Sequence, residues 1–267
     1  MYILLSIAPP HNPTPLTSIA PATSAFVIHT AAENDAKVTS AQGITVKPDM
    51  DFEEAVDRLD EFGVVVVPGG GTEPILKANA EPINLIKKFT ELQENDPSKE
   101  RTLMSVCTGS LFLAQAGVLQ GLSATTHPDY YTKLESLCQI ASRDDSGIRT
   151  DVMEERYVVN NARFDLGEKW EDNPFISDKR PDGKPRKASI RKGSESYKLS
   201  QRRESLAKRM NMPLGGLRVI TSGGVVAGID ASLYLVAALV SYESAIEMAR
   251  YTQFTWQKGV TVDAVDV

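Results

Sequence analysis

The chain has few cysteines and few features that would place it outside the cytoplasm. Two cysteines among 267 residues do not make a disulfide framework. No hydrophobic run approaches the length of a membrane span. The apolar opening, Met1 to Ala8, has no basic lead and is followed by Pro9 and Pro10, so it does not resemble a signal peptide. These absences predict a cytoplasmic protein without membrane contact.

Positive charge is also scarce. The 29 Lys and Arg residues are outnumbered by 35 Asp and Glu residues, which gives a formal net charge of -6 and argues against general nucleic-acid binding. The composition, 42% hydrophobic and 24% charged, is that of an ordinary globular protein with a full core. We interpret residues 1–267 as a single domain, although this length would also permit two small ones.

Apolar runs of strand length alternate with segments of helix length along most of the chain. The expected strands are Tyr2–Ile7, Ala25–Ala31, Gly63–Val67, Thr102–Val106, Arg156–Asn160 and Leu217–Ser222. The expected helices are 51–59, 82–93, a segment from Gly109 onward, 131–140, and one long apolar helix from about Ala227 to Tyr251. This alternation predicts an α/β fold whose sheet is mostly parallel and covered on both faces.

Cys107 stands between the expected strand Thr102–Val106 and the helix that begins near Gly109. In such a turn the sulfur lies near the N–H groups and positive end of a helix, which favours the thiolate form. The nucleophile of many hydrolases occupies the same kind of turn, beside backbone N–H groups that bind an anion. The alternative is a buried core cysteine, which free cysteines often are. We expect that alternative for Cys138, on the apolar side of its helix.

Three further turns follow strands of the same expected sheet. They are Pro68–Gly71, His127 after the short strand that starts at Gly121, and Gly223–Gly224. Ligands of parallel sheets bind at the carboxyl ends of the strands, so we expect these turns and Cys107 at one edge. This convergence favours the nucleophile over the core interpretation of Cys107.

Four short motifs are specific only when taken together. They are Val-Val-Val-Pro-Gly-Gly at 65–70, Ser-Val-Cys-Thr-Gly at 105–109, Ala-Thr-Thr-His at 124–127, and Thr-Ser-Gly-Gly-Val-Val-Ala-Gly-Ile-Asp at 221–230. In this order they resemble the ThiJ/PfpI superfamily, which has the class I glutamine-amidotransferase-like fold, and most of all its isocyanide hydratase branch. The resemblance implies a flavodoxin-like three-layer sandwich, a homodimer, and no metal or organic cofactor.

The resemblance also implies roles for residues at this edge. Cys107 would be the nucleophile, and the backbone N–H groups of Gly70 and Thr108 would form an oxyanion pocket. Gly71 and Gly224 belong to turns whose missing side chains let backbone amides approach a ligand, so we include them as substrate-binding positions.

One loop departs from the pattern of the family. The family carries Leu-Asp-x-x-Gly-Pro after the first strand, and its carboxylate reaches the cysteine. The aligned segment here, Leu16–Pro21, contains no acid. Either the acid is lost or another group serves in its place, and the candidates are His11, His127 and Asp230.

Two of these candidates have structural alternatives. His127 is suited to orient or deprotonate a group beside Cys107, since histidine titrates near neutral pH. It would equally cap the helix that is entered through Pro128. Asp230 is favoured in the first turns of a helix by the helix dipole alone, while its place in the Gly-Ile-Asp motif favours a role in positioning the site.

A second departure is an insertion late in the chain, from about Phe164 to Gly216. Residues 179–209 hold 12 Lys and Arg against 3 Asp and Glu, so this segment is basic while the rest of the chain is acidic. Its first half, Ser177–Ser194, is polar and rich in Pro and Gly, which is typical of a mobile loop. Glu195–Met212 would form a basic helix. We favour a solvated insertion; a lid or a partner-binding arm is the alternative.

Two classes of function fit these residues. The first is an enzyme that acts on a small electrophilic substrate through Cys107, most concretely by hydrating an isocyanide to an N-formamide. Glyoxalase-like action on an α-oxoaldehyde, or a biosynthetic step in the same pocket, would use the same parts. The second is a non-catalytic ligand or redox sensor in which Cys107 is oxidised or lines the pocket. The missing carboxylate favours the sensor; the intact cysteine turn favours the enzyme, which we prefer.

Overall fold

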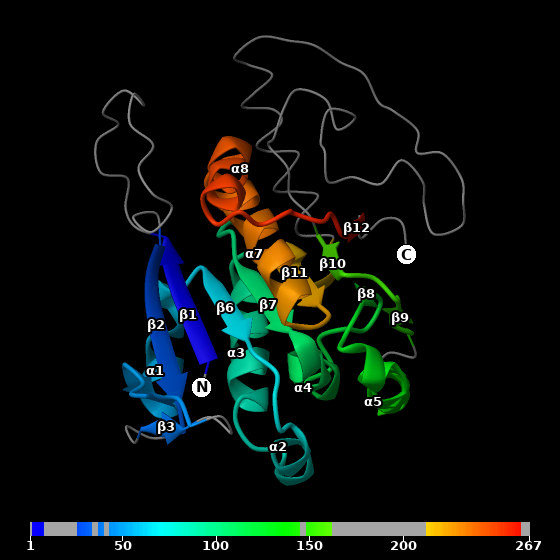
Figure 1. The fold of residues 1–267 in the computed structure, drawn as a ribbon. Helices are drawn as coiled ribbons and strands as arrows, with labels where there is room; N and C mark the ends of the chain where they lie inside the picture. Colours follow the sequence, from blue (N-terminus) through cyan, green and yellow to red (C-terminus); the bar gives the residue numbers. More distant parts are fainter. Residues whose placement is uncertain are drawn as a thin grey trace, which may run out of the picture.

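The computed structural model describes residues 2–7, 26–33, 37–39, 43–144, 148–161 and 212–262. In this part of the chain, eight strands form one sheet in the order β12-β10-β11-β7-β6-β1-β2-β5 (Figure 1). Its strands are β1 (Tyr2–Ile7), β2 (Phe26–Ala32), β5 (Met50–Asp51), β6 (Val64–Val67), β7 (Thr102–Val106), β10 (Tyr157–Asn160), β11 (Arg218–Ser222) and β12 (Val260–Val262). Two short pairs lie outside this sheet: β3 (Val38–Thr39) with β4 (Thr45–Val46), and β8 (Ser123–Ala124) with β9 (Asp151–Val152).

The sheet is mixed and mostly parallel, as the alternation of strands and helices predicts. Strands β2, β5, β6, β7 and β11 run in one direction, whereas β1, β10 and β12 run in the other. At the parallel centre, Leu103 of β7 lies between Val65 of β6 and Val219 of β11. The carboxyl ends of β6, β7 and β11 therefore share one edge of the sheet. We call it the Cys107 edge, because Cys107 follows β7, and we call the opposite one the far edge.

Helices cover both faces of the sheet (Figure 1). One face is covered by α1 (Phe52–Asp57), α3 (Ile83–Asn95), α4 (Ser110–Gln115) and α5 (Tyr131–Asp144), and the other by α7 (Val225–Leu239) and α8 (Tyr242–Tyr251). A further helix, α2 (Glu73–Ala78), follows β6. Short 3-10 helices lie at Leu59–Glu61, Cys107–Gly109, Pro128–Tyr130 and Pro213–Gly216.

Side chains of the central strands alternate between two hydrophobic cores. Val65 and Leu103 belong to the core under α1, α3, α4 and α5, while Val64 and Met104 belong to the core under α7. All four are almost completely buried. Strands covered on both faces are therefore continuous apolar runs in the sequence, which is why these elements are predictable. The expected three-layer α/β architecture is confirmed.

The apolar stretch after β11 forms two helices, so the prediction of one long helix is wrong. Helix α7 ends at Leu239 and α8 begins at Tyr242. Between them Ser241 caps α8, its hydroxyl accepting a hydrogen bond from the Ser244 N–H at 3.1 Å. A serine at this position satisfies an N–H that has no partner inside the helix, so a single polar residue ends an otherwise apolar run.

Strand β1 runs antiparallel to both of its neighbours. Leu5 pairs with Val64, at the start of β6, so Ile7 and the end of β1 lie at the far edge. Phe26 pairs with Ile7 and begins β2 at the same edge. Residues 8–25, which include His11, lie outside the described residues, but the chain enters and leaves this segment at the far edge rather than beside Cys107.

The predicted basic insertion is also attached at the far edge. Its main part, residues 162–211, lies outside the described residues, as does most of the helix predicted within it. The described ends lie side by side, because the Asn161 amide group donates to the carbonyl oxygens of Pro213 (3.1 Å) and Leu217 (2.8 Å). These ends join the antiparallel neighbours β10 and β11.

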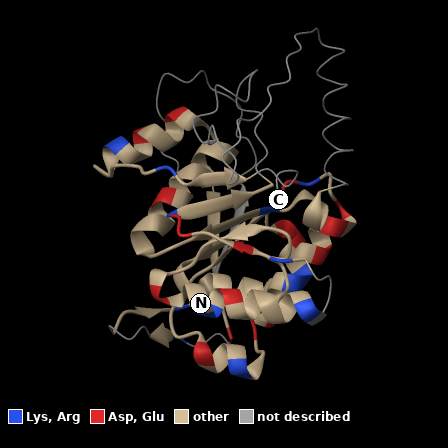
Figure 2. Ribbon diagram, turned by 90° about the vertical axis from the view of Figure 1, so that its right-hand side faces the viewer, with Lys and Arg blue, Asp and Glu red and all other residues tan. Residues whose placement is uncertain are grey.

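Charged residues of both signs are interspersed over the described part of the chain, mostly on helices and at their ends (Figure 2). The central strands carry almost none, in keeping with their burial on both faces. Within the described residues, no helix is both long enough and apolar enough to cross a membrane.

Candidate active site

Cys107 occupies a left-handed turn between β7 and a helix. Val106 ends β7 in an extended conformation, Cys107 has a φ of +59°, and the short helix Cys107–Gly109 leads directly into α4. A positive φ is uncommon for a residue with a Cβ atom and costs on the order of 1–3 kcal/mol, so surrounding contacts must hold it. A strained strand-to-helix turn of this kind is the arrangement that exposes the nucleophile in hydrolases.

Three hydrogen bonds fix the peptide groups of Cys107. Its N–H donates to the carbonyl oxygen of Gly223 at 2.7 Å. Its carbonyl oxygen accepts from Thr126 Oγ1 at 3.2 Å and from Ser110 Oγ at 3.3 Å. Gly223 follows β11 and Thr126 precedes His127, so the structure brings the turns after β8 and β11 into contact with the cysteine turn.

The turn after β6 also packs closely against the cysteine turn, because each of the two turns has a glycine at the point of contact. A Cβ atom on Gly69 would lie 2.6 Å from Thr108 N, 2.7 Å from Thr108 Oγ1 and 2.9 Å from Cys107 Cβ. A Cβ atom on Gly109 would lie 2.2 Å from the carbonyl oxygen of Val67. Only glycine at both positions allows the two turns to approach this closely.

One of the two predicted oxyanion donors, the Gly70 N–H, is engaged by the side chain of Thr108 in this structure. The Gly70 N–H donates to Thr108 Oγ1 at 2.9 Å, and this hydroxyl donates to the Gly70 carbonyl oxygen at 3.2 Å. An N–H held in this way is not directed at a substrate, so Gly70 serves as an oxyanion donor only if the bond opens. The Thr108 N–H stays a predicted donor. A Cβ atom on Gly71 or Gly224 would meet nothing within 4 Å, so both predicted substrate-binding positions face open space.

His127 is the N-cap of the short helix Pro128–Tyr130. Its Nδ1 accepts a hydrogen bond from the Asp129 N–H at 3.3 Å and lies 3.7 Å from Asp129 Oδ2. The ring contacts Tyr130 edge-on, with centroids 6.0 Å apart. The structural alternative for His127 is therefore observed, and any proton transfer by this side chain falls to Nε2.

Asp230 is completely buried, and both of its carboxylate oxygens accept hydrogen bonds. Oδ2 accepts from Arg156 Nε at 2.8 Å and from Arg156 Nη2, and Oδ1 accepts from the Gln257 N–H at 2.7 Å. With both oxygens occupied by donors from the protein, this carboxylate is not arranged to protonate a substrate. It joins α7 to the residue before β10 and to the segment before β12.

Arg156 is the polar residue near the site that sequence reasoning missed. Its position at the start of an expected strand gives no indication of a role. The available signal was Asp230 itself, because an acid within an apolar helix is buried only when it is paired. That signal predicts a cationic partner without identifying it.

The two cysteines differ in their surroundings. Cys107 is half-buried at the Cys107 edge, whereas Cys138 is buried on α5 among core residues. Burial raises the pKa of the Cys138 thiol, which keeps it protonated and unreactive near neutral pH. The expectation that Cys138 is a core residue is confirmed.

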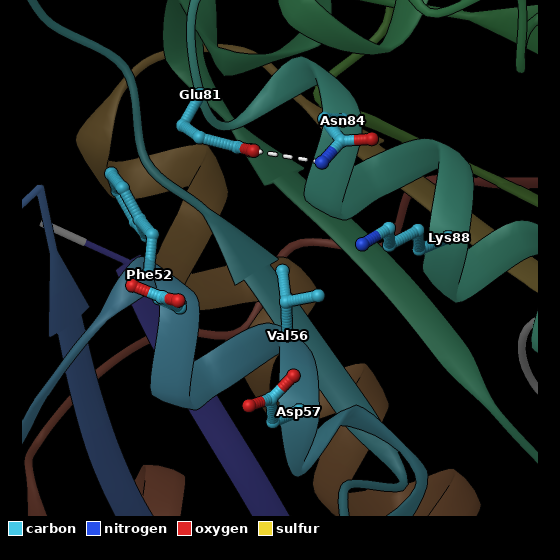
Figure 3. A pocket seen from close by; sticks show the side chains of 7 residues that line it. Phe52, Val56, Asp57, Glu81, Asn84 and Lys88 are labelled. Atoms are coloured by element: carbon cyan, nitrogen blue, oxygen red, sulfur yellow. Dashed lines mark hydrogen bonds between the residues drawn. The ribbon is translucent and has the colours of Figure 1, made fainter.

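A groove of about 400 Å³ lies between α1 and α3 (Figure 3). Its lining contains no predicted site residue and consists of Phe52, Glu53, Val56, Asp57, Glu81, Asn84 and Lys88. Within it Asn84 Nδ2 donates to Glu81 Oε1 at 2.9 Å, so these two polar groups satisfy each other. In the described part of the chain, no group of three or more His, Cys, Asp or Glu side chains is placed to hold a metal ion. Cys107 therefore remains the candidate site.

The fold and the site define a three-layer α/β sandwich with a strained cysteine turn at the carboxyl ends of its central strands. Comparison with known proteins defines the family. A model of the DJ-1/PfpI family matches residues 15–180, which is more than half of the chain. The chain belongs to this family and has its flavodoxin-like α/β fold. The resemblance to the ThiJ/PfpI superfamily that the four motifs indicate is confirmed.

Individual relatives match over part of their length. Isonitrile hydratase of Pseudomonas putida is 35% identical over 117 residues, 44% of this chain and 46% of that protein. A deglycase of Thermococcus kodakarensis is 33% identical over 99 residues, 37% of this chain and 54% of that protein. The chain thus spans about half the length of these curated relatives. Among solved structures, a ThiJ/PfpI family protein from Pseudomonas syringae is similar with a TM-score of 0.47 and 19% identity, over 85% of this chain and 62% of that one.

Proposed function

We propose that this protein is an enzyme in which Cys107 attacks an electrophilic carbon of a small molecule, and that its substrate is an isocyanide. The observation that carries the proposal is the left-handed conformation of Cys107, with φ of +59° and an N–H held by Gly223 at 2.7 Å. A conformation that costs free energy and is held by several contacts is typical of residues at functional sites. A core cysteine such as Cys138 needs no such arrangement.

The proposed reaction consumes one water molecule. The Cys107 thiolate forms a bond to the terminal carbon of the isocyanide, and that carbon gains a proton to give a thioimidate. Water then adds to the same carbon. The carbon–sulfur bond breaks, the thiolate leaves, and the nitrogen takes a proton, so that an N-formamide is released.

The first step of this mechanism needs a proton donor near Cys107, and the buried and exposed polar side chains differ in how well they fit this role. The buried Asp230 carboxylate already accepts from Arg156 and Gln257, so it fits a positioning role better than that of an acid. His127 follows Thr126, whose hydroxyl donates a hydrogen bond to the Cys107 carbonyl oxygen. The Nδ1 atom of His127 accepts the capping hydrogen bond from the Asp129 N–H. We propose that His127 supplies the proton through Nε2, with His11 as the alternative.

A second candidate substrate has support of its own. The protein from Thermococcus kodakarensis that is 33% identical over 99 residues, and one from Pyrococcus abyssi that is 33% identical over 91 residues, are both named deglycases. An α-oxoaldehyde has an electrophilic carbonyl carbon that the same thiolate would attack. The isonitrile hydratase match, 35% identical over 117 residues, is longer and supports the isocyanide as the first choice.

Turnover measured with matched cysteine variants tests this proposal. Wild-type protein, Cys107→Ala and Cys138→Ala are incubated with a panel of isocyanides and a panel of α-oxoaldehydes, and products are followed by NMR. We expect formamide production that falls at least about 10³-fold in Cys107→Ala, since the nucleophile is lost. Cys138→Ala should stay within about twofold of wild type. Full activity of Cys107→Ala would refute the mechanism.

The reactivity of the thiols is measured on the same proteins. We expect iodoacetamide to alkylate Cys107 much faster than Cys138 at neutral pH. Fast alkylation without turnover of either panel would favour the ligand or redox sensor. Assembly as a homodimer, which the resemblance implies, action on a small molecule, and the cytoplasmic location that the sequence predicts belong to the same proposal.

A further inference from the structure

An ion pair between the buried Asp230 and the partly exposed Arg156 is connected to the strained cysteine by a continuous series of hydrogen bonds. Arg156 Nε and Nη2 donate to Asp230 Oδ2. The carbonyl oxygen of Arg156 accepts from the Gly223 N–H at 2.9 Å, and the carbonyl oxygen of Gly223 accepts from the Cys107 N–H at 2.7 Å. We propose that Asp230 and Arg156 are positioning residues, which hold Cys107 in its left-handed conformation through the Gly223 peptide groups.

Strand pairing alone does not fix Gly223. The ladder between β7 and β11 ends with Ser222 beside Val106, and that between β10 and β11 ends with Ser222 beside Tyr157. Gly223 is the first residue beyond both ladders and has no side chain to anchor it. A Cβ atom there would meet its nearest neighbour, the Thr126 carbonyl oxygen, at 3.5 Å, so packing around it is ordinary rather than tight. The bond from its N–H to Arg156 therefore determines where its carbonyl oxygen lies.

The ion pair in turn determines where the Arg156 backbone lies. Asp230 is 0% exposed and sits on α7, while Arg156 precedes β10 and its side chain is 41% exposed. A buried carboxylate that loses its cation is strongly unfavourable, so the guanidinium cannot move away from Asp230 without a large cost. Because the Arg156 side chain is tethered at Nε and Nη2, its backbone is held at a set distance from α7.

The second oxygen of Asp230 restricts α7 itself. Oδ1 accepts from the Gln257 N–H, which belongs to the segment that leads into β12. Gly228, two residues before Asp230, packs against β7, where a Cβ atom would lie 2.7 Å from Val106 Cγ1. The helix that carries Asp230 is thus fixed against β7, the strand that leads into Cys107. Both Arg156 and Asp230 are thus held in place, as a positioning role requires.

This inference depends on the proposed function in one respect: the proposed function supplies the reason why Cys107 must be held in position. Its structural part is tested directly, by amide hydrogen exchange resolved to single residues. The test variant is Arg156→Met/Asp230→Asn, which removes both charges together and leaves an amide oxygen to accept from the Gln257 N–H. We expect the Cys107 and Gly223 amides to exchange at least tenfold faster, while Leu103 in the middle of β7 is unchanged. The matched control is Arg250→Met, which breaks an exposed ion pair with Glu247 on α8 and should alter none of these amides.

Alkylation of Cys107 gives a second readout. We expect the double variant to react with iodoacetamide about threefold to tenfold more slowly, as loss of one supporting hydrogen bond would produce. Arg156→Lys keeps the charge and should restore part of the rate. With a confirmed substrate, kcat should fall and KM should stay within about twofold.

The outcomes separate this inference from the proposed function. Unchanged exchange at Cys107 and Gly223 in a folded double variant overturns the positioning role, whatever the enzyme does. Faster exchange of all three amides, including Leu103, also overturns it, because the pair would then stabilise the fold as a whole. Slow alkylation of wild-type Cys107 would instead count against the proposed function, and the exchange result would still decide the positioning role.

Discussion

Replacing Gly69 by alanine tests whether the approach of the β6 turn holds the cysteine turn in place. The added Cβ atom would lie 2.6 Å from Thr108 N, 2.7 Å from Thr108 Oγ1 and 2.9 Å from Cys107 Cβ. Carbon atoms in favourable contact stand about 3.5–4.0 Å apart. One of the two turns must therefore move by roughly 1 Å, and the three atoms nearest to the new methyl group all belong to the cysteine turn.

A displacement of this size predicts separate effects on activity and on stability. A 1 Å misplacement of reacting groups costs on the order of 10² in rate, so we expect kcat on a confirmed substrate to fall about 10²-fold. Overpacking costs typically 1–3 kcal/mol, which for a protein of this size lowers Tm by roughly 2–4 °C for each kcal/mol. The Gly69→Ala protein should therefore be folded at 25 °C, with a Tm several degrees below that of wild type.

The matched control is Gly71→Ala, two residues away in the same turn, where a Cβ atom would meet nothing within 4 Å. Gly71 is itself a predicted substrate-binding position, so this control is compared by Tm and by iodoacetamide alkylation rather than by turnover. We expect wild-type behaviour in both measurements for Gly71→Ala, and slower alkylation of Cys107 in Gly69→Ala. If Gly69→Ala matches wild type in Tm and alkylation, the turn after β6 moves freely, and the argument from close packing is refuted.

Two further predictions concern the supply of protons and the response to alkaline pH. We expect His127→Ala or His11→Ala to lower turnover of a confirmed substrate at least about tenfold, within the usual range for a general acid; if both variants keep full activity, the proton comes from elsewhere. Burial raises the pKa of Tyr157 to about 12, so the stability contributed by the neutral phenol is present below about pH 10 and lost as pH rises toward 12. Denaturant titrations at a series of pH values over that range should show that Tyr157→Phe reduces the loss of stability by roughly 2–3 kcal/mol, and an unchanged loss in the variant would contradict this assignment.

The central sheet follows from the sequence because its strands are buried on both faces. Strands β6, β7 and β11 are short runs in which almost every residue is buried, and each is followed by glycine or by the cysteine turn within a few residues. Such runs, separated by helical segments, predict parallel neighbours and a common carboxyl edge. The same reasoning brings Cys107 and Gly223 together, as the hydrogen bond between them confirms. The expectation that the short strand before His127 belongs to this sheet is wrong, because β8 pairs with β9 outside it, although Thr126 still bonds the Cys107 carbonyl oxygen.

The direction of β1 and the break before α8 depend on different information. Apolar periodicity identifies β1 as a strand, but its direction depends on pairing with β2 and β6. The break depends on one capping side chain, Ser241, within a stretch that composition alone predicts to be continuous. In both cases a specific hydrogen-bonding pattern overrides a general tendency.

The partners of buried polar groups are also beyond sequence reasoning. Arg156 and Asp230 are 74 residues apart, and no local pattern connects them. The Gly70 N–H is engaged by the Thr108 hydroxyl, a contact that requires the exact approach of two turns. Residue type and spacing predict which groups need a partner, whereas the packed structure determines which partner each one has.

The geometry of the sheet favours one of the two histidines that are candidates to replace the carboxylate of the family. Gly223, which accepts a hydrogen bond from the Cys107 N–H, follows β11 at the Cys107 edge. The turn after β8, which carries Thr126 and His127, contacts the cysteine turn from outside the sheet. The segment with His11 is attached at the opposite edge, through Ile7 and Phe26. A strand of five residues is about 16 Å long, so a group on that segment would have to be brought back over the length of the sheet, while His127 is already next to a residue that bonds the nucleophile. We therefore expect His127 rather than His11 to replace the carboxylate of the family, and the comparison of His127→Ala with His11→Ala tests this directly.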